Sequence, residues 1–128
     1  MIKQVIIAPM LLIMLSACLV SRTERPRITG HVYDHKTRMP LEGCKVAEAY
    51  TDSLGFFLLK ERRFWEFAFP GGEAPPVMIY ELVEKENYKT DTLRAFNRYG
   101  GSARKGVHWE MDTIFLKENS IYPDTLGK

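Results

Sequence analysis

From residue 28 onward, the chain is a series of short runs rich in β-branched and aromatic residues, each ended by turn-forming residues. No run carries a sustained 3.6-residue apolar period, so we expect little helix in this part of the chain. The runs predicted to form strands are 28–34, 44–50, 56–60, 63–69, 77–84, 88–93 and 107–116. Six to eight strands at this spacing predict an all-β domain, either a sandwich or a barrel.

Composition narrows the class of protein further. A chain of 128 residues is long enough for one ordinary domain and too short for two. A hydrophobic fraction of 45% excludes wholesale disorder. The 18 basic and 16 acidic residues leave a net charge of +2, which gives no support for nucleic-acid binding. Two cysteines are too few for a disulfide scaffold.

The first twenty residues differ from the rest of the chain. Lys3 is the only charged residue before Arg22. Residues 5–15 form an uncharged apolar run, which is followed by two small residues and a cysteine at 16–18. A positive start, a short apolar run and small residues at a cleavage position are typical of an export signal. A transmembrane helix is the alternative, but it needs about 20 consecutive apolar residues. This run is shorter and contains Pro9.

The tetrad Leu15-Ser16-Ala17-Cys18 resembles the bacterial lipobox. In that family the cysteine thiol is diacylated, the chain is cut before the cysteine, and the new amino group is acylated. The resemblance implies cleavage between Ala17 and Cys18 and a membrane anchor on Cys18, with the two or more acyl chains that stable anchoring needs. Leu19 follows, not the aspartate that retains enterobacterial lipoproteins in the inner membrane, so we expect the outer membrane. A cysteine placed there by chance is the alternative.

These features divide the chain into parts. We expect a signal peptide over 1–17, a lipidated N-terminus and polar tether over 18–27, a β-sandwich domain over 28–118 and a polar tail over 119–128. Once Cys18 carries lipid, Cys44 has no partner, so no intramolecular disulfide is expected even in an oxidising periplasm. We expect Cys44 to be buried, unpaired and inert, with a reactive thiol as the alternative.

The stretch 28–46 resembles the opening of carboxypeptidase regulatory-like domains. That family opens with glycine, valine and aspartate, followed by a turn that ends in proline-leucine-x-glycine-alanine-x-valine. The matching positions here are Gly30, Val32, Asp34, Pro40, Leu41, Gly43 and Val46, with Cys44 in the place of alanine. The next family element, threonine-aspartate and then glycine-x-phenylalanine, is matched by Thr51, Asp52, Gly55 and Phe57. Looser similarity follows at Asn87-Tyr88 and over 112–116.

This resemblance implies a seven-stranded, antiparallel, Greek-key β-sandwich of the transthyretin-like type. In carboxypeptidases the domain accompanies the enzyme and performs no hydrolysis, so the resemblance implies a non-catalytic binding or structural module without a cofactor. Anchored at Cys18, the domain would face the periplasm. Besides the membrane, an envelope protein or a glycan is the expected partner, whereas nucleic acid and metal are not expected.

One enzyme with this shape, the transthyretin-related hydroxyisourate hydrolase, gives the alternative function. Its opening contains histidine-valine-x-aspartate, which is matched by His31-Val32-Tyr33-Asp34. Its catalytic arginine follows a turn glycine, where this chain has Phe56-Phe57. Its C-terminal tyrosine-arginine-glycine-serine is absent from 124–128, and residues 99–102 match it only partly, without the arginine. A cleft that lacks this cation loses its means of stabilising an anionic product, which disfavours the enzyme.

The histidines and the basic residues are the remaining candidates for a site. His31 and His35 have the spacing of two zinc ligands on a helix, but on a strand they would be about 13 Å apart. His108 is alone, so exposed histidines without a metal are expected. The loop 94–105 combines aromatic residues with the cations Arg94, Arg98, Arg104 and Lys105. Such cations could contact an anionic glycan, lipid headgroups or peptidoglycan, and a solvated loop is the alternative.

Period-two alternation, together with the resemblance to carboxypeptidase regulatory-like domains, assigns the predicted core. Val32 and Val46 should face inward on neighbouring strands, and Ile79 and Leu116 should close the interior.

The densest aromatic stretch spans residues 64–69. Phe67 and Phe69 alternate with polar or small residues, so we expect them in the core, with Trp65 exposed on the opposite face. A binding patch is the alternative for this stretch.

Overall fold

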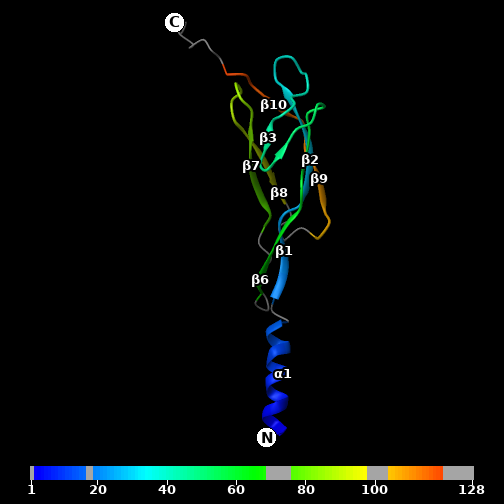
Figure 1. Ribbon diagram of the computed structural model, residues 1–128, viewed down its shortest axis with the longest axis vertical. Helices are drawn as coiled ribbons and strands as arrows, with labels where there is room; N and C mark the ends of the chain where they lie inside the picture. The colour runs from blue at the N-terminus through cyan, green and yellow to red at the C-terminus, as the bar shows by residue number, and fades with distance from the viewer. Residues whose placement is uncertain (1, 17–18, 69–75, 98–103, 120–128) are drawn as a thin grey trace.

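The computed structural model describes residues 2–16, 19–68, 76–97 and 104–119. These residues are mostly β-structure in largely antiparallel sheets, as the sequence predicted, with one helix at the N-terminus (Figure 1). In chain order the elements are α1 (Ile2–Ser16), β1 (Leu19–Arg25), β2 (Arg27–Asp34), β3 (Lys45–Val46), β4 (Ala49–Tyr50), β5 (Phe56–Leu59), β6 (Arg62–Phe67), β7 (Met78–Glu84), β8 (Asp91–Phe96), β9 (His108–Glu110) and β10 (Ile114–Leu116).

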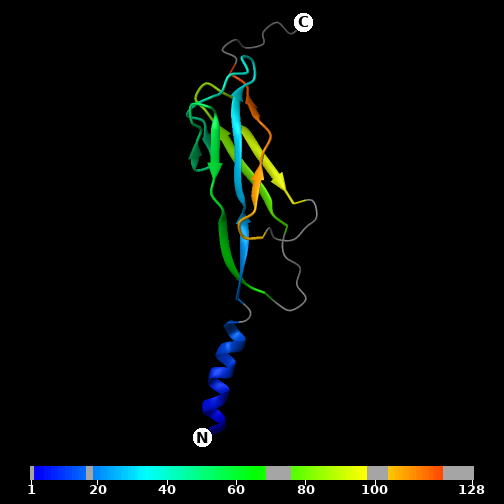
Figure 2. The ribbon, with the colours of Figure 1, turned by 90° about the vertical axis from the view of Figure 1, so that its right-hand side faces the viewer.

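Two layers of strands make up the body of the domain (Figures 1 and 2). In the first layer β2 is central, with antiparallel β5 on one edge and β9 and β10 on the other. The second layer has the order β4-β3-β7-β8, and all of its pairs are antiparallel. The arrangement is consistent with the predicted sandwich.

The core lies between these layers and draws on both of them. The prediction that Val32, Val46, Ile79 and Leu116 face inward is confirmed, because each is at most 3% exposed. The rest of the buried apolar cluster consists of Ile28, Cys44, Phe57, Leu59, Val77, Val83 and Leu93. A continuous apolar interior of this kind is the main source of the domain's stability.

Two glycines of the predicted motif are required by close packing. A Cβ atom on Gly30 would lie 2.8 Å from the Phe57 ring, so only glycine lets β2 and this ring approach each other. Gly55 has a positive φ of 73°, and a Cβ there would lie 2.4 Å from the Val32 carbonyl oxygen. The Gly55 carbonyl in turn accepts a hydrogen bond from the Val32 N–H at 2.8 Å. Gly30 therefore fixes the contact between β2 and β5, and Gly55 fixes the contact between β2 and the turn before β5.

Two predicted strands are interrupted. The run 44–50 forms the short hairpin β3–β4, because Ala47 takes a left-handed φ of 50° and reverses the chain. The run 107–116 is divided into β9 and β10, and between them the Met111 N–H still donates to the Thr29 carbonyl at 2.8 Å.

The strands β9 and β10, at the edge of the first layer, run in an unexpected direction. Both strands run parallel to β2, whereas an antiparallel neighbour was predicted. The physical reason is the path of the chain: β8 runs toward the α1 end of the molecule, where β2 also begins, so the chain returns alongside β2 in the same direction (Figure 2). The predicted strand 88–93 is likewise displaced along the chain, to Asp91–Phe96.

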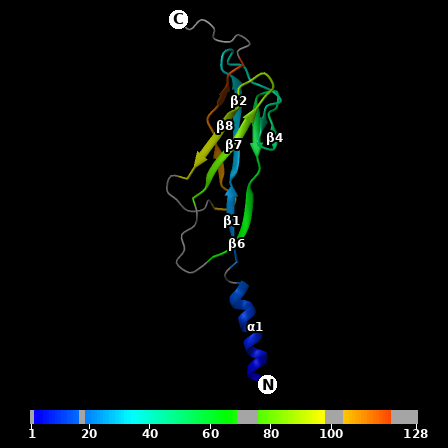
Figure 3. The same cartoon turned by 90° about the vertical axis from the view of Figure 1, so that its left-hand side faces the viewer.

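The segment 18–27, predicted to be a tether, is ordered where the structure describes it. Leu19–Arg25 forms β1 and pairs antiparallel with β6, with a register shift between Thr23 and Arg25. The prediction of a tether is wrong for these residues, because the backbone of this polar segment pairs with a second strand. The ribbon of β1 and β6 lies between α1 and the two layers (Figures 2 and 3).

The aromatic stretch on β6 also differs from its prediction. Phe67 is 67% exposed, so its assignment to the core is wrong, whereas the predicted exposure of Trp65 is confirmed at 68%. Residues two apart in a strand point to the same face, so Trp65 and Phe67 share a face rather than opposing each other. Phe69 lies outside the described residues.

Helix α1 is formed by the apolar N-terminal run and contains Pro9. Within the part of the chain that the structure describes, no helix combines the length and the apolar character needed to cross a membrane.

Candidate functional site

The junction between α1 and β1 is where the sequence places its most specific motif. Helix α1 ends at Ser16 and β1 begins at Leu19. Ala17 and Cys18, the predicted cleavage and lipidation positions, fall between these elements and outside the described residues. The described part of the candidate site follows Cys18. It consists of the two-stranded ribbon formed by β1 and β6 and of a charged cluster at its base, the end next to the two layers.

The Arg63 side chain on β6 forms hydrogen bonds with residues of β1 and so links the two strands of the ribbon. Its Nε donates to Ser21 Oγ at 2.9 Å and its Nη2 to the Ser21 carbonyl at 3.1 Å. Its Nη1 donates to Thr23 Oγ1 at 2.8 Å and to Glu61 Oε1 at 3.1 Å. The guanidinium thus satisfies polar groups of β1 while its own charge faces a carboxylate.

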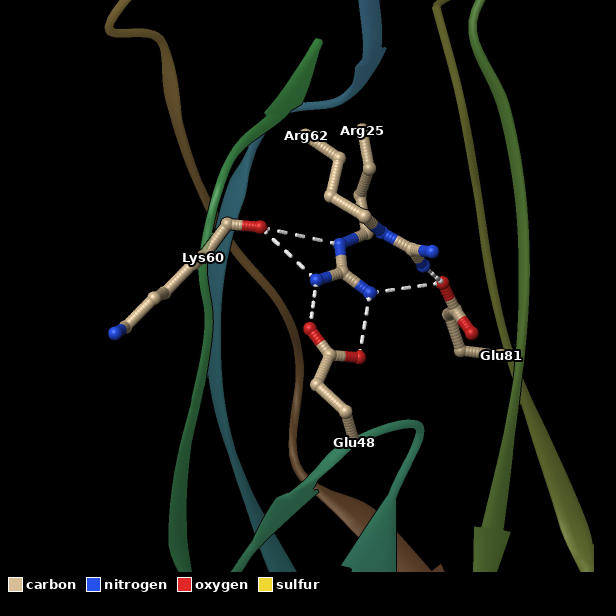
Figure 4. A network of polar contacts seen from close by, with 5 residues as sticks. All are labelled: Arg25, Glu48, Lys60, Arg62 and Glu81. Atoms are coloured by element: carbon tan, nitrogen blue, oxygen red, sulfur yellow. Dashed lines mark hydrogen bonds and ion pairs between the residues drawn. The ribbon is translucent and has the colours of Figure 1, made fainter.

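The charged cluster at the base of the ribbon is centred on Arg25, which is only 1% exposed (Figure 4). Its Nη1 donates to Glu48 Oε2 and to Glu81 Oε1, both at 3.0 Å, and its Nη2 also pairs with Glu48 Oε1. The Lys60 carbonyl accepts from Nη2 at 2.9 Å and from Nε at 3.3 Å. Arg62 reaches the same Glu81 Oε1 at 2.9 Å.

These contacts join four parts of the fold at one point. Arg25 ends β1, Glu48 lies in the β3–β4 hairpin, Glu81 is on β7, and the Lys60 carbonyl lies between β5 and β6. Two guanidinium groups face two carboxylates, so the cluster is balanced in charge. A buried arginine needs such partners, because an unpaired buried charge is very costly.

Electrostatics in the cluster favour the ionised forms. Burial lowers the pKa of Arg25, but hydrogen bonds and charges from Glu48 and Glu81 outweigh it, so the pKa is raised overall. The hydrogen bond from Arg25 lowers the pKa of Glu48 to about 2, against the opposing effect of burial. Arg25 and Glu48 therefore stay ionised across the physiological range of pH.

Sequence reasoning missed this cluster, although one signal was present. Glu81 lies between Ile79 and Val83 in a strand whose inward positions alternate, so its carboxylate falls on the buried face. An acidic residue at such a position requires a cationic partner. Arg25, the partner, is 56 residues away in sequence, and no local pattern identifies it.

The predicted basic loop is only partly described. Arg94 lies on β8 opposite Tyr80 and is exposed, in the second layer. Arg104 and Lys105 are exposed in the turn before β9, which belongs to the first layer. Arg98 lies outside the described residues. The described cations therefore belong to different layers.

The histidines do not gather into a site. His31 lies on β2, in edge-on contact with the Phe56 ring at 5.5 Å, and His35 is exposed beyond the strand end. His108 Nε2 lies 2.6 Å from Thr29 Oγ1. Among the described residues, no three side chains of the metal-ligating types come together to hold an ion.

Asp34, the last residue of β2, has a structural task. Its Oδ1 accepts from the backbone N–H groups of Lys36 and Thr37 at 2.7 and 2.8 Å, and its Oδ2 accepts from the Tyr88 hydroxyl at 2.7 Å. The Thr37 N–H and the Tyr88 hydroxyl lower the pKa of Asp34 to about 2. The same contact with Asp34 raises the pKa of Tyr88 to about 12. The carboxylate thus closes the turn after β2 and joins it to the turn between β7 and β8.

Cys44 is free and buried, as predicted. Burial raises the pKa of its thiol, although a hydrogen bond involving Thr51 opposes the shift. Thr51 Oγ1 accepts from the Cys44 N–H at 2.9 Å and donates to the Leu41 carbonyl at 2.6 Å, so the surrounding polar groups are satisfied. A buried thiol with a raised pKa forms little thiolate, the reactive form.

Two shallow depressions lie at the end of the domain opposite α1, with volumes of about 250 Å³ and about 480 Å³. Both are lined by Lys117, the first together with Lys89 and Asp91 and the second together with His35 and Glu118. Their mixed charges favour no particular class of ligand.

Comparison with known proteins gives this chain no relative: no family model and no curated protein matches it.

Proposed function

We propose that this chain is a bacterial lipoprotein, cleaved between Ala17 and Cys18 and anchored through acyl chains on Cys18. Its domain is a carboxypeptidase regulatory-like module that faces the periplasm, with the outer membrane as the site of the anchor. The module has a non-catalytic role, either structural or in binding an envelope protein or a glycan.

One observation carries the proposal: the lipobox-like tetrad lies where an apolar helix gives way to the first strand of a folded domain. Helix α1 covers 15 residues and ends at Ser16, and β1 begins at Leu19. A signal peptidase needs its cleavage position between the apolar segment and the exported domain. In the sequence Cys18 lies between these two segments, and the core among the described residues begins at Ile28.

The roles of the motif residues support a more specific assignment of the fold, a seven-stranded Greek-key sandwich of the transthyretin-like type. If β1–β2, β5–β6 and β9–β10 are each counted as one interrupted strand, seven strands remain. Gly30 and Gly55 have close-packing roles that explain why glycine is needed at these motif positions. Asp34 and Tyr88, which both belong to the resemblance, are hydrogen-bonded to each other.

The same residues argue against the alternative, a hydroxyisourate hydrolase. Asp34, which matches the aspartate of that enzyme's opening, has both carboxylate oxygens engaged in turn contacts. Phe57, one of the two residues that stand where the enzyme has its catalytic arginine, is 1% exposed and packs in the core. We therefore propose a module without catalytic activity.

The experiment compares the same substitution at the two cysteines. Cys18→Ala should abolish labelling by a palmitate analogue and leave the precursor uncut, whereas Cys44→Ala should be labelled and processed like the wild type. Separation of inner and outer membranes on a density gradient then gives the location. Undiminished labelling of the Cys18→Ala protein would refute the lipoprotein assignment.

A further inference from the structure

The β1–β6 ribbon is attached to the body of the domain at its base, through the charged cluster around Arg25. Its two strands pair only with each other, as a sheet separate from the two layers. It projects toward α1, away from the body of the domain (Figure 3). An isolated two-stranded ribbon is at best marginally stable in water, so a long one gains stability from a surface that covers it.

The strand register collects apolar side chains on one face of this ribbon. Leu19 is opposite Phe67, and Ser21 is opposite Trp65. Cross-strand partners and residues two apart share a face, so Leu19, Trp65 and Phe67 lie together. Their exposed fractions are 43%, 68% and 67%. Large aromatic side chains are rarely left this exposed beside one another without a partner.

We propose that Leu19, Trp65 and Phe67 form a membrane-contact face, which inserts into the headgroup region of the bilayer and seats the domain on its surface. The inference rests on the proposed anchor at Cys18. The occupant of this face is a lipid bilayer, and the domain is held against the membrane rather than swinging on a tether.

Distance from the anchor carries this assignment. Leu19 directly follows the proposed lipidated residue, and Phe67 is one strand spacing away from Leu19, about 4.8 Å. Trp65 lies opposite Ser21, three residues beyond Cys18, or roughly 10 Å along an extended chain. Interfacial side chains enter a bilayer by about 5–10 Å. An acylated Cys18 therefore brings all three side chains within reach of the interface.

The side chains of the membrane-contact face are of types that suit the surface of a lipid bilayer. Tryptophan is enriched at membrane interfaces, where its ring is buried and its N–H stays hydrated. The charges nearby are already paired, Arg22 with Glu66 and Arg63 with Glu61. Contact with the bilayer would therefore leave no isolated charge to be desolvated.

A second exposed apolar surface provides the contrast. On the second layer, Met78 lies opposite Phe96, and nearby Tyr80 is 62% exposed. This surface is as exposed as the ribbon face, but it belongs to β7 and β8 and has no connection to Cys18. It serves as the matched control in the experiment.

The experiment measures contact of single tryptophans with lipid. The chain has two tryptophans, so Trp109→Phe leaves Trp65 alone. The acylated protein is reconstituted into phosphatidylcholine vesicles whose acyl chains are brominated near the headgroup. We expect the emission of Trp65 to shift to the blue and to be strongly quenched by the bromines.

Two control proteins carry their only tryptophan elsewhere, in a background with Trp65→Phe and Trp109→Phe. Tyr80→Trp places it on the second layer, and Phe64→Trp places it on the opposite face of the ribbon. Both should be quenched far less than Trp65. Circular dichroism confirms that each variant is folded before it is measured.

The outcomes separate the inference from the proposed function. The intact mass of each preparation shows whether Cys18 carries acyl chains. A protein without acyl chains would overturn the proposed anchor, and the membrane-contact face with it. An acylated protein whose Trp65 is quenched no more than the tryptophan at position 80 or 64 would overturn the membrane-contact face alone. Selective quenching of Trp65 supports the inference.

Discussion

Replacement of Arg25 by methionine tests the charged cluster at the base of the ribbon. The change keeps most of the buried volume and removes every contact of the guanidinium. The Lys60 carbonyl loses two donors, and the loss of a hydrogen bond to a charged group costs about 1.5–3 kcal/mol. Breaking a buried ion pair costs about 3–5 kcal/mol, but Glu48 is 55% exposed and Glu81 keeps Arg62, which places the loss at the low end. Both costs come from breaking the same contact network, so they overlap rather than add, and we expect a loss of about 3 kcal/mol in the free energy of unfolding.

The assay is urea unfolding followed by circular dichroism. With a urea dependence of about 1–3 kcal/mol per molar, this loss should lower the midpoint by roughly 1–3 M. Arg62→Met is the matched control, because Arg62 contacts the same Glu81 oxygen but is 48% exposed. An exposed pair contributes at most about 1 kcal/mol, so this control should unfold close to the wild type.

The reasoning is refuted if Arg25→Met and Arg62→Met unfold at the same midpoint. A second experiment tests why the Arg25→Met protein loses stability. If the loss arises from carboxylates left without a cation, adding Glu48→Gln and Glu81→Gln to Arg25→Met should restore part of the stability.

Further predictions concern the titrating groups and the core. Glu48 and Asp34 both have a pKa lowered to about 2 in the folded protein. Each carboxylate therefore stabilises the fold above its unfolded pKa of about 4, and this contribution is lost as the pH falls toward 2. In Glu48→Gln and in Asp34→Asn, the melting temperature should decline less steeply in acid than in the wild type. Val32→Asp buries an unpaired charge at a cost of several kcal/mol out of about 5–15, so its melt should lose cooperativity. Cys44→Ala should fold with a loss of about 1 kcal/mol. The native Cys44 thiol should label far more slowly than the unfolded one, and equal rates would contradict its burial.

Much of the sandwich was predictable because local patterns determine it. Apolar and β-branched runs between turn residues identified β2, β5 and β7. Alternation, together with the family resemblance, gave the inward direction of Val32, Val46, Ile79 and Leu116. Two of the motif glycines, Gly30 and Gly55, marked positions where a side chain would collide with a neighbour. The burial of Cys44 followed from its place after Gly43 in the same motif.

The remainder depends on contacts that local patterns do not encode. Residues 19–25 are polar and resemble a tether, and only pairing with β6, some forty residues later, makes them a strand. Arg25 is buried because of partners 23 and 56 residues away. Phe67 alternates like a core residue, yet the second layer does not extend over the ribbon, so the same pattern produces an exposed face. The alternation of a strand reveals which residues share a face but not whether that face is covered.

The N-terminal peptide of the mature protein, isolated from cell envelopes and analysed by tandem mass spectrometry, tests the central claim most directly. The account predicts a peptide that begins at Cys18, with a diacylglyceryl group on its thiol and an acyl chain on its amine. A peptide that contains Ala17 joined to an unmodified Cys18 would contradict it.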